Sequence, residues 1–162
     1  MAGNEIRIGI GDLNVANAPT SLITVGLGSC IGIALYDSKN KIGGLAHIML
    51  PDSTQFSKIS NEMKFADLAI PMLINKIVKQ GADKKNLKAK IAGGSSMFNF
   101  TDKKMTMDVG GRNICAVKEA LKRQSIPIIA EDLGGNKGRT VTLDTNTGMF
   151  KIKIAGTDIK EI

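Results

Sequence analysis

Apolar residues along this chain alternate between short extended runs and longer helical spacings. Runs of four to ten apolar or β-branched residues, bounded by glycine, proline, asparagine or aspartate, predict short strands. These runs cover residues 6–11, 21–25, 31–36, 41–50, 87–92 and 127–130, and a final hairpin of 140–143 and 149–154 around residues 145–148. Asp37 to Asn40 has the composition of a turn between two of these strands.

Two segments have helical periodicity instead. In residues 61–80, apolar side chains recur at three- and four-residue steps, and Gly81 lies where a helix would end. Pro71 interrupts this pattern, so it predicts either a kink or a later helix start. Residues 113–124 form the second predicted helix, with Ile114, Val117 and Leu121 facing inward.

The strands come first as a hairpin, then alternate with helices, then end as a hairpin. This order favours an α+β or mixed α/β layered fold over a doubly wound parallel sheet. The chain has 162 residues and neither an internal repeat nor a low-complexity linker, so we expect a single domain over residues 1–162.

Charge and composition limit the classes of partner and the cellular location that we expect for this protein. The net charge is +7, and the excess lies in residues 81–162, which hold 15 Lys and Arg against 9 Asp and Glu. Aromatic residues make up only 4%, and no basic stretch alternates with aromatics, so we expect no nucleic-acid partner. Two cysteines, no signal-peptide pattern and no long apolar run predict a cytoplasmic protein without membrane insertion.

His47 is the only histidine, and its distance along the chain from Cys30 is informative. If the turn at residues 37–40 joins two antiparallel strands symmetrically, Cys30 lies directly opposite His47, within reach of a thiol–imidazole contact. A different loop length or a bulge would shift this register. A thiol beside an imidazole can act as a nucleophile. The alternative is that both side chains are structural, as we expect for Cys115 in the core.

The residues before Cys30 suit the same chemistry. Gly28 and Ser29 belong to a glycine-containing stretch that can bend sharply and direct backbone N–H groups at a reacting carbonyl, forming an oxyanion hole. Glycine-rich stretches at residues 93–96 and 134–139 match no phosphate-binding loop, and either make turns or line a site. One histidine and two cysteines without a ligand spacing predict no metal, and we expect no other cofactor.

Several motifs together resemble the CheD family over nearly the whole chain. They are TVGLGSC at residues 24–30, GLAHIMLPDS at 44–53, KFAD at 64–67, AKIAGG at 89–94, GRN at 111–113 and AEDLGGN at 130–136. The resemblance implies an enzyme that hydrolyses glutamine side-chain amides of methyl-accepting chemoreceptors to glutamate and ammonia during chemotactic adaptation. It implies a catalytic triad of Cys30, His47 and Thr24, and a layered sandwich related to the deamidase domain of cytotoxic necrotizing factor toxins.

The resemblance also implies binding to a CheC-type phosphatase. A regulatory adaptor of that phosphatase is therefore the alternative to the enzyme, and the two roles can coexist. Met97, Phe98 and Phe100 follow a glycine-rich stretch among polar residues. They would form a partner-binding patch if exposed, and part of the core if they pack inward.

Overall fold

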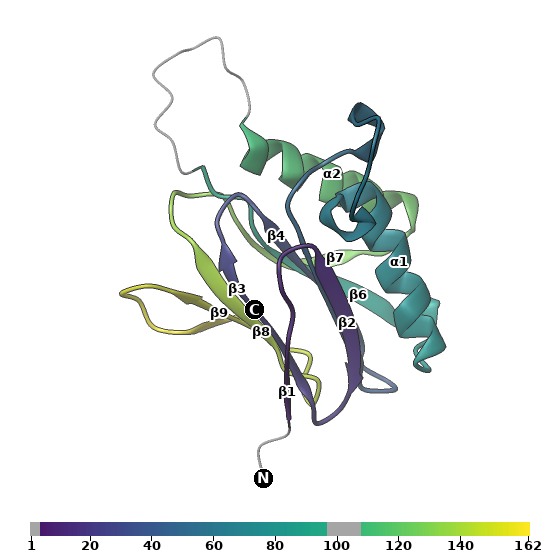
Figure 1. The fold of residues 1–162 in the computed structure, drawn as a ribbon. Coiled ribbons are helices and arrows are strands. Elements are labelled where there is room, and N and C mark those ends of the chain that lie inside the picture. Colours follow the sequence, from purple (N-terminus) through teal and green to yellow (C-terminus); the bar gives the residue numbers. More distant parts are fainter. Residues whose placement is uncertain (1–3, 97–107) are drawn as a thin grey trace.

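Two β-sheets and a pair of helices build the protein in three layers (Figure 1). The computed structural model describes residues 4–96 and 108–162. The first sheet has the strand order β1 (Glu5–Arg7), β3 (Ser21–Leu27), β8 (Arg139–Leu143), β9 (Phe150–Ile154) and β10 (Lys160–Glu161). The second sheet has the order β2 (Asp12–Asn17), β5 (Ile42–Ile48), β4 (Ile31–Asp37), β6 (Leu87–Gly93) and β7 (Ile128–Leu133). The helices are α1 (Ala66–Lys79) and α2 (Val109–Arg123).

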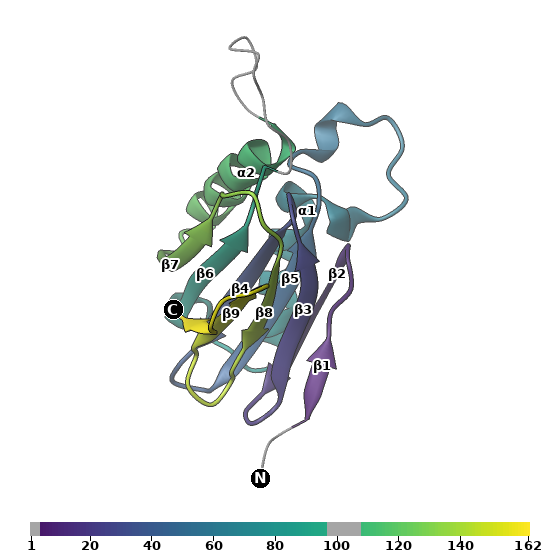
Figure 2. The ribbon, with the colours of Figure 1, turned by 90° about the vertical axis from the view of Figure 1, so that its left-hand side faces the viewer.

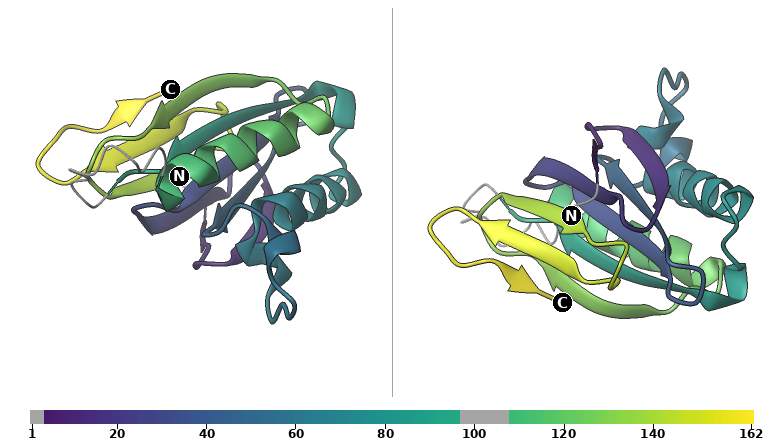
Figure 3. Two further views of the ribbon diagram at one scale, coloured as in Figure 1. Left: turned by 90° about the horizontal axis from the view of Figure 1, so that it is seen from above. Right: turned by 90° about the horizontal axis from the view of Figure 1, so that it is seen from below.

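Both helices lie on the outer face of the second sheet, as Figures 2 and 3 show from the side and from the two ends. One apolar cluster fills the space between the helices and this sheet, and a second cluster fills the space between the two sheets. The second sheet is therefore buried on both faces. This agrees with β5, in which every residue is buried, and with β4, in which only Tyr36 is partly exposed.

Alternation along β4 and β5 decides which side chains enter the layer between the sheets. Ile33 and Ala46 face the helices, whereas Ala34 and Leu45 face the first sheet. Because side chains of a strand alternate between faces, His47 lies on the face of Leu45. The predicted site residue His47 is thus placed in the narrow layer between the sheets.

The predicted α+β layered fold is confirmed, with differences at several boundaries. The first strand ends at Arg7 instead of extending to residue 11, and β2, which follows it, was not predicted. Asp12, Asn14 and Asn17 are poor strand formers, and pairing of β2 with β5 overrides that preference. The likeness to the toxin deamidase domain stays a prediction.

The helix boundaries also differ from the prediction. α1 begins at Ala66, because the preceding residues form two short 3₁₀ turns with capping side chains of their own, η1 (Ser53–Gln55) and η2 (Glu62–Lys64). A third 3₁₀ turn, η3 (Lys84–Asn86), precedes β6. Pro71 lies inside α1. α2 begins four residues earlier than predicted, where the Asp108 carboxylate accepts a hydrogen bond from the Gly111 N–H. Within residues 4–96 and 108–162, no helix has the length and apolar character needed to cross a membrane.

Candidate active site

A buried threonine–histidine contact joins the two sheets. Thr24 lies on β3 of the first sheet and His47 on β5 of the second, and neither side chain is exposed. The Thr24 hydroxyl donates a hydrogen bond of 2.6 Å to the carbonyl oxygen of Ile8, and its Oγ1 lies 2.7 Å from His47 Nδ1. A hydroxyl has one proton, so at the second contact Oγ1 accepts and Nδ1 donates. The geometry therefore selects the His47 tautomer that carries its proton on Nδ1.

The other ring nitrogen of His47 is left with a free lone pair. Nε2 is buried and has no hydrogen-bond partner among the described residues. Burial lowers the pKa of His47 from 6.5 to about 4, because the imidazolium form would lose its hydration. At neutral pH the ring is thus uncharged, and Nε2 can accept a proton.

Cys30 directly precedes Ile31, the first residue of β4, and β4 belongs to the second sheet, which borders this layer. Its side chain is partly exposed and packs against the apolar cluster between the sheets, the layer that also contains His47. Burial raises the pKa of the Cys30 thiol, and a hydrogen bond from its own backbone N–H partly offsets that rise. At rest the two groups are therefore a thiol and a neutral imidazole, not a preformed ion pair.

The predicted register between Cys30 and His47 is wrong by two residues. Gly32, not Cys30, pairs with His47, because the loop between β4 and β5 spans residues 38–41 and Asp37 pairs with Ile42. The Asp37 carboxylate accepts hydrogen bonds from the backbone N–H groups of residues 39 and 40. Asp37 therefore stays in the strand, and the loop begins at residue 38. A shift of two residues preserves the face of a strand. Cys30, one residue before β4, packs against the apolar cluster between the sheets, on the face to which His47 also belongs.

Backbone hydrogen bonds fix the segment that carries Cys30. The Gly28 N–H donates to the Gly26 carbonyl over 3.1 Å and closes a tight turn, which is the structural role of Gly28 here. The Ser95 N–H and hydroxyl both donate to the Gly28 carbonyl, at 2.9 and 2.7 Å. The Gly94 N–H donates to the Cys30 carbonyl over 2.9 Å. The segment that carries Cys30 is thus held by the chain that follows β6.

Gly93 shows how closely these segments approach. A Cβ atom at this position would lie 2.2 Å from the Cys30 carbonyl oxygen, and the backbone φ angle is +116°. Both observations require glycine. Of the two glycine-rich stretches, the one at residues 93–96 therefore packs directly against the site. The one at residues 134–139 lies behind it, where the Gly134 N–H donates to the Gly93 carbonyl.

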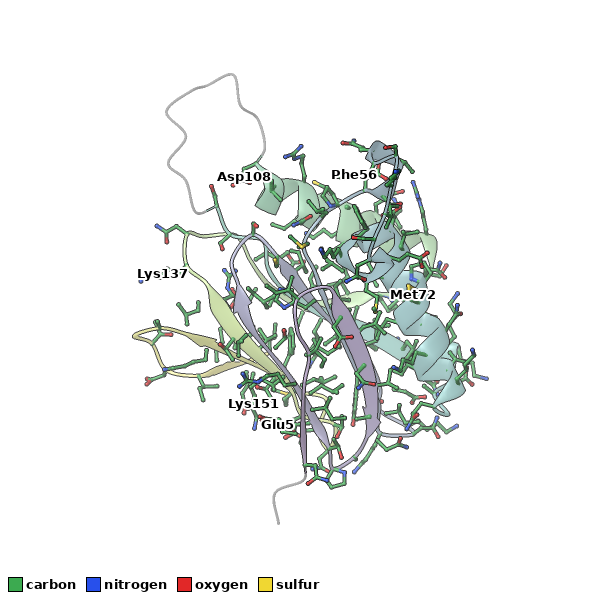
Figure 4. All side chains as sticks on the ribbon, viewed as in Figure 1. Glu5, Phe56, Met72, Asp108, Lys137 and Lys151 are labelled. Atoms are coloured by element: carbon green, nitrogen blue, oxygen red, sulfur yellow. The ribbon has the colours of Figure 1, made fainter. Side chains whose placement is uncertain are left out.

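Two polar residues beside the site had no signal in the sequence strong enough to identify them. Ser95 and Asn113 contact the Cys30 segment across 67 and 84 residues of chain, and such distant pairs leave no local pattern. In the sequence, Asn113 belongs to the GRN motif of the family resemblance and begins the second predicted helix, and neither feature indicates a contact with Cys30. Asp108, labelled in Figure 4, begins the helix that carries Asn113.

The remaining predicted residues have different outcomes. Cys115 is exposed and not in the core, because it lies two positions from both Asn113 and Val117, two of the buried residues of α2. Met97, Phe98 and Phe100 lie outside the described residues. Among the residues that the structure describes, no cluster of three His, Cys, Asp or Glu could hold a metal ion.

Comparison with known proteins agrees with this architecture and identifies relatives. A Neisseria meningitidis protein of the DUF152 family superposes with a TM-score of 0.52 at 9% identity. The match covers 82% of this chain and 64% of that one, and at this identity it shows the fold alone.

Two clostridial relatives match over almost the full length, and a family model matches most of it. A Clostridium novyi (strain NT) protein named "Probable chemoreceptor glutamine deamidase CheD" is 68% identical over 162 residues, all of both chains. A protein of the same name from Clostridium botulinum (strain Hall) is 66% identical over 98% of each chain. The family model described as CheD chemotactic sensory transduction matches residues 49–154. This chain therefore belongs to the CheD family.

Proposed function

We propose that this protein is a chemoreceptor glutamine deamidase whose nucleophile is Cys30 and whose proton acceptor is His47. Three relatives that bear the name of this activity are 64–68% identical to the chain over 98% or more of its length. The observation that carries the residue assignment is the Thr24–His47 contact. It leaves an unprotonated, unpartnered Nε2 in the layer against which Cys30 packs.

The first half of the reaction forms a thioester. As the glutamine side chain enters, Nε2 of His47 takes the thiol proton and Sγ of Cys30 attacks the amide carbon. Because both groups are neutral at rest, the reaction requires transfer of the thiol proton to His47. The imidazolium then gives its proton to the departing nitrogen, and ammonia leaves as the carbon–nitrogen bond breaks.

The second half regenerates the enzyme. Nε2, again unprotonated, accepts a proton from a water molecule as that water attacks the thioester carbonyl. The carbon–sulfur bond breaks, the thiol recovers its proton from His47, and the side chain leaves as glutamate. The sum is one amide and one water converted to one carboxylic acid and one ammonia, so no cofactor is required.

Thr24 has the orienting role in this proposal. In both protonation states of His47, Nδ1 carries a proton that Oγ1 can accept, so the ring stays in one orientation throughout the cycle. Thr24 is itself oriented by its bond to the Ile8 carbonyl. A neutral hydroxyl stabilises the imidazolium less than a carboxylate would.

Backbone donors beside the thiol complete the proposed site. The Cys30 N–H lies on the side of its own sulfur, as the hydrogen bond between them requires. We assign this N–H and that of Ser29 to the oxyanion of the tetrahedral intermediate. The Gly28 N–H is already bonded to Gly26, so Gly28 contributes the turn that presents these donors.

The activity is tested by incubating the protein with a chemoreceptor cytoplasmic fragment, measuring ammonia and mapping the products by mass spectrometry. Conversion of particular glutamines to glutamates, absent with Cys30→Ala, is the expected result. Cys115→Ser is the matched control, since it removes the exposed cysteine and should leave the rate unchanged. Deamidation that persists in Cys30→Ala would refute the assignment of the nucleophile.

A CheC-type phosphatase remains a proposed partner, and regulation of that phosphatase remains the alternative function. The basis for both is the family resemblance. Cys30→Ala separates the roles, because it should abolish deamidation and can leave phosphatase binding intact. A cytoplasmic location is part of the proposal and is consistent with Cys30 and Cys115 forming no disulfide.

A further inference from the structure

Asn113 bridges the two chain segments that bear the proposed nucleophile and base. Its side chain is fully buried where α2 meets the second sheet. The Nδ2 group donates one hydrogen bond of 2.9 Å to the Ser29 carbonyl and another of 3.1 Å to the Met49 carbonyl. Ser29 directly precedes Cys30, and Met49 follows His47 by two residues.

The orientation of this amide is dictated by its partners. Both are carbonyl oxygens, which only accept hydrogen bonds, so the opposite orientation would place Oδ1 against two acceptors. In the observed orientation Oδ1 is buried and has no partner among the described residues. A buried acceptor without a partner destabilises a fold. Oδ1 therefore gives no reason for an asparagine at this position. The two hydrogen bonds donated by Nδ2 are the contacts that only a side chain with a donor can make.

The position of the bridge explains what it can do. Ile31 and Ile48 are the last pair in the ladder between β4 and β5, and beyond them the two strands are no longer paired. The Ser29 and Met49 carbonyls lie just past this point. Nδ2 thus joins the two segments where ladder hydrogen bonds no longer set their separation.

The beginning of α2 is itself fixed against the site. A Cβ atom on Gly110 would lie 2.5 Å from the Ser95 carbonyl oxygen, so the first turn of the helix packs directly on the segment after β6. One turn later, Asn113 reaches the Ser29 and Met49 carbonyls. The bonds from Gly94 and Ser95 hold only the Cys30 segment, whereas Asn113 holds both segments.

We infer that Asn113 is a positioning residue that sets the separation of the Cys30 thiol and the His47 imidazole. The inference rests on the proposed function for its catalytic meaning, but the geometry it concerns can be measured without a receptor. Asn113 does not need to contact substrate, so its loss should lower kcat and leave KM nearly unchanged. A displacement of about 1 Å between reacting groups is enough to lower the rate about 10²-fold.

The test uses the full chain in a Cys115→Ser background, so that Cys30 is the only thiol. Asn113→Leu removes the donor and the unpartnered acceptor together. Val117→Ala, on the same helix and equally buried, is the control for general loosening of α2. Each variant is assayed for unfolding by urea, for receptor deamidation, and for the rate of iodoacetamide alkylation of Cys30 against pH.

The expected result is that folded Asn113→Leu loses about 10²-fold in kcat and that its alkylation profile matches that of His47→Asn. Val117→Ala should keep the parental profile. Parental kcat and profile in folded Asn113→Leu would overturn the inference. If Asn113→Leu does not fold, Asn113→Ala is assayed instead, and failure of both to fold would show a purely structural residue. Absence of deamidation in the parent would refute the proposed function, while the alkylation profiles would still decide the role of Asn113.

Discussion

Acidification from about pH 6.5 to about pH 4 should lower the unfolding free energy of this protein through His47. Over most of this range the carboxylates of the protein change their protonation little. The chain has one histidine, and burial lowers the pKa of that histidine from 6.5 to about 4. Between these two values the unfolded chain holds a proton on His47 that the folded protein does not. The state that binds more protons gains as the pH falls, so stability decreases from about pH 6.5 downward and the loss levels off below about pH 4.

The magnitude follows from the size of the pKa change. One pKa unit corresponds to about 1.4 kcal/mol, so the complete change amounts to roughly 3 kcal/mol. Of this, about 2 kcal/mol should be lost between about pH 7.5 and about pH 5. Burial alone would raise the pKa of Asp37, but hydrogen bonds from its neighbours lower it from 3.8 to about 2. Protonation of Asp37 therefore lowers the unfolding free energy only at pH values below this range.

The assay is urea unfolding followed by circular dichroism at a series of pH values. His47→Asn keeps a donor near the Thr24 hydroxyl and removes the titrating ring. The wild-type unfolding free energy should fall by about 2 kcal/mol over the range, whereas that of His47→Asn should stay almost flat. Parallel curves for the two proteins would refute the claim that His47 is buried and neutral.

Two further predictions, each with a matched control variant, test the surroundings of the proposed reacting groups. Thr24→Val removes the acceptor for His47 Nδ1 and should lower kcat by about tenfold to 10²-fold; Thr24→Ser keeps the hydroxyl and should retain most activity, so equal rates in the two variants would argue against an orienting role. Gly93→Ala places a Cβ against the Cys30 carbonyl oxygen at a positive φ angle and should destabilise the fold by roughly 3 kcal/mol or more. Gly134→Ala has a positive φ angle but nothing within 4 Å of its Cβ, so thermal unfolding should show a smaller loss, and an equal loss would contradict the role of the close approach.

The sequence predicted the elements that have a strong local signal. The two helices and most strands of the second sheet follow from apolar periodicity, because their inward residues are numerous and regularly spaced. β2 could not be predicted, since its polar residues are accommodated only by pairing with β5. The register of β4 and β5 also escaped prediction, because the Asp37 side chain, and not the symmetry of the turn, determines where the loop begins.

For the candidate site too, local patterns could be predicted from the sequence, whereas contacts between distant segments could not. Cys30 and His47 became candidates because one histidine and one cysteine across a short hairpin form a local pattern, and Thr24 became one through the family resemblance. Their catalytic roles stay predictions. The positions of Ser95 and Asn113 beside the candidate site could not be predicted, because their hydrogen bonds join segments far apart in the chain and no spacing along the sequence encodes them. The neutral resting state of the pair also needed the structure, since it follows from burial.

Trapping of the acyl-enzyme with hydroxylamine tests the proposed thioester at Cys30 most directly. Hydroxylamine competes with water for a thioester and converts it to a hydroxamate, so the wild-type protein acting on a chemoreceptor fragment should yield glutamyl hydroxamate at the glutamines that it otherwise deamidates. Mass spectrometry should find the hydroxamate fraction rising with hydroxylamine concentration, and none with Cys30→Ala. Glutamate as the sole product at every hydroxylamine concentration would contradict a thioester intermediate and with it the assignment of Cys30 as nucleophile.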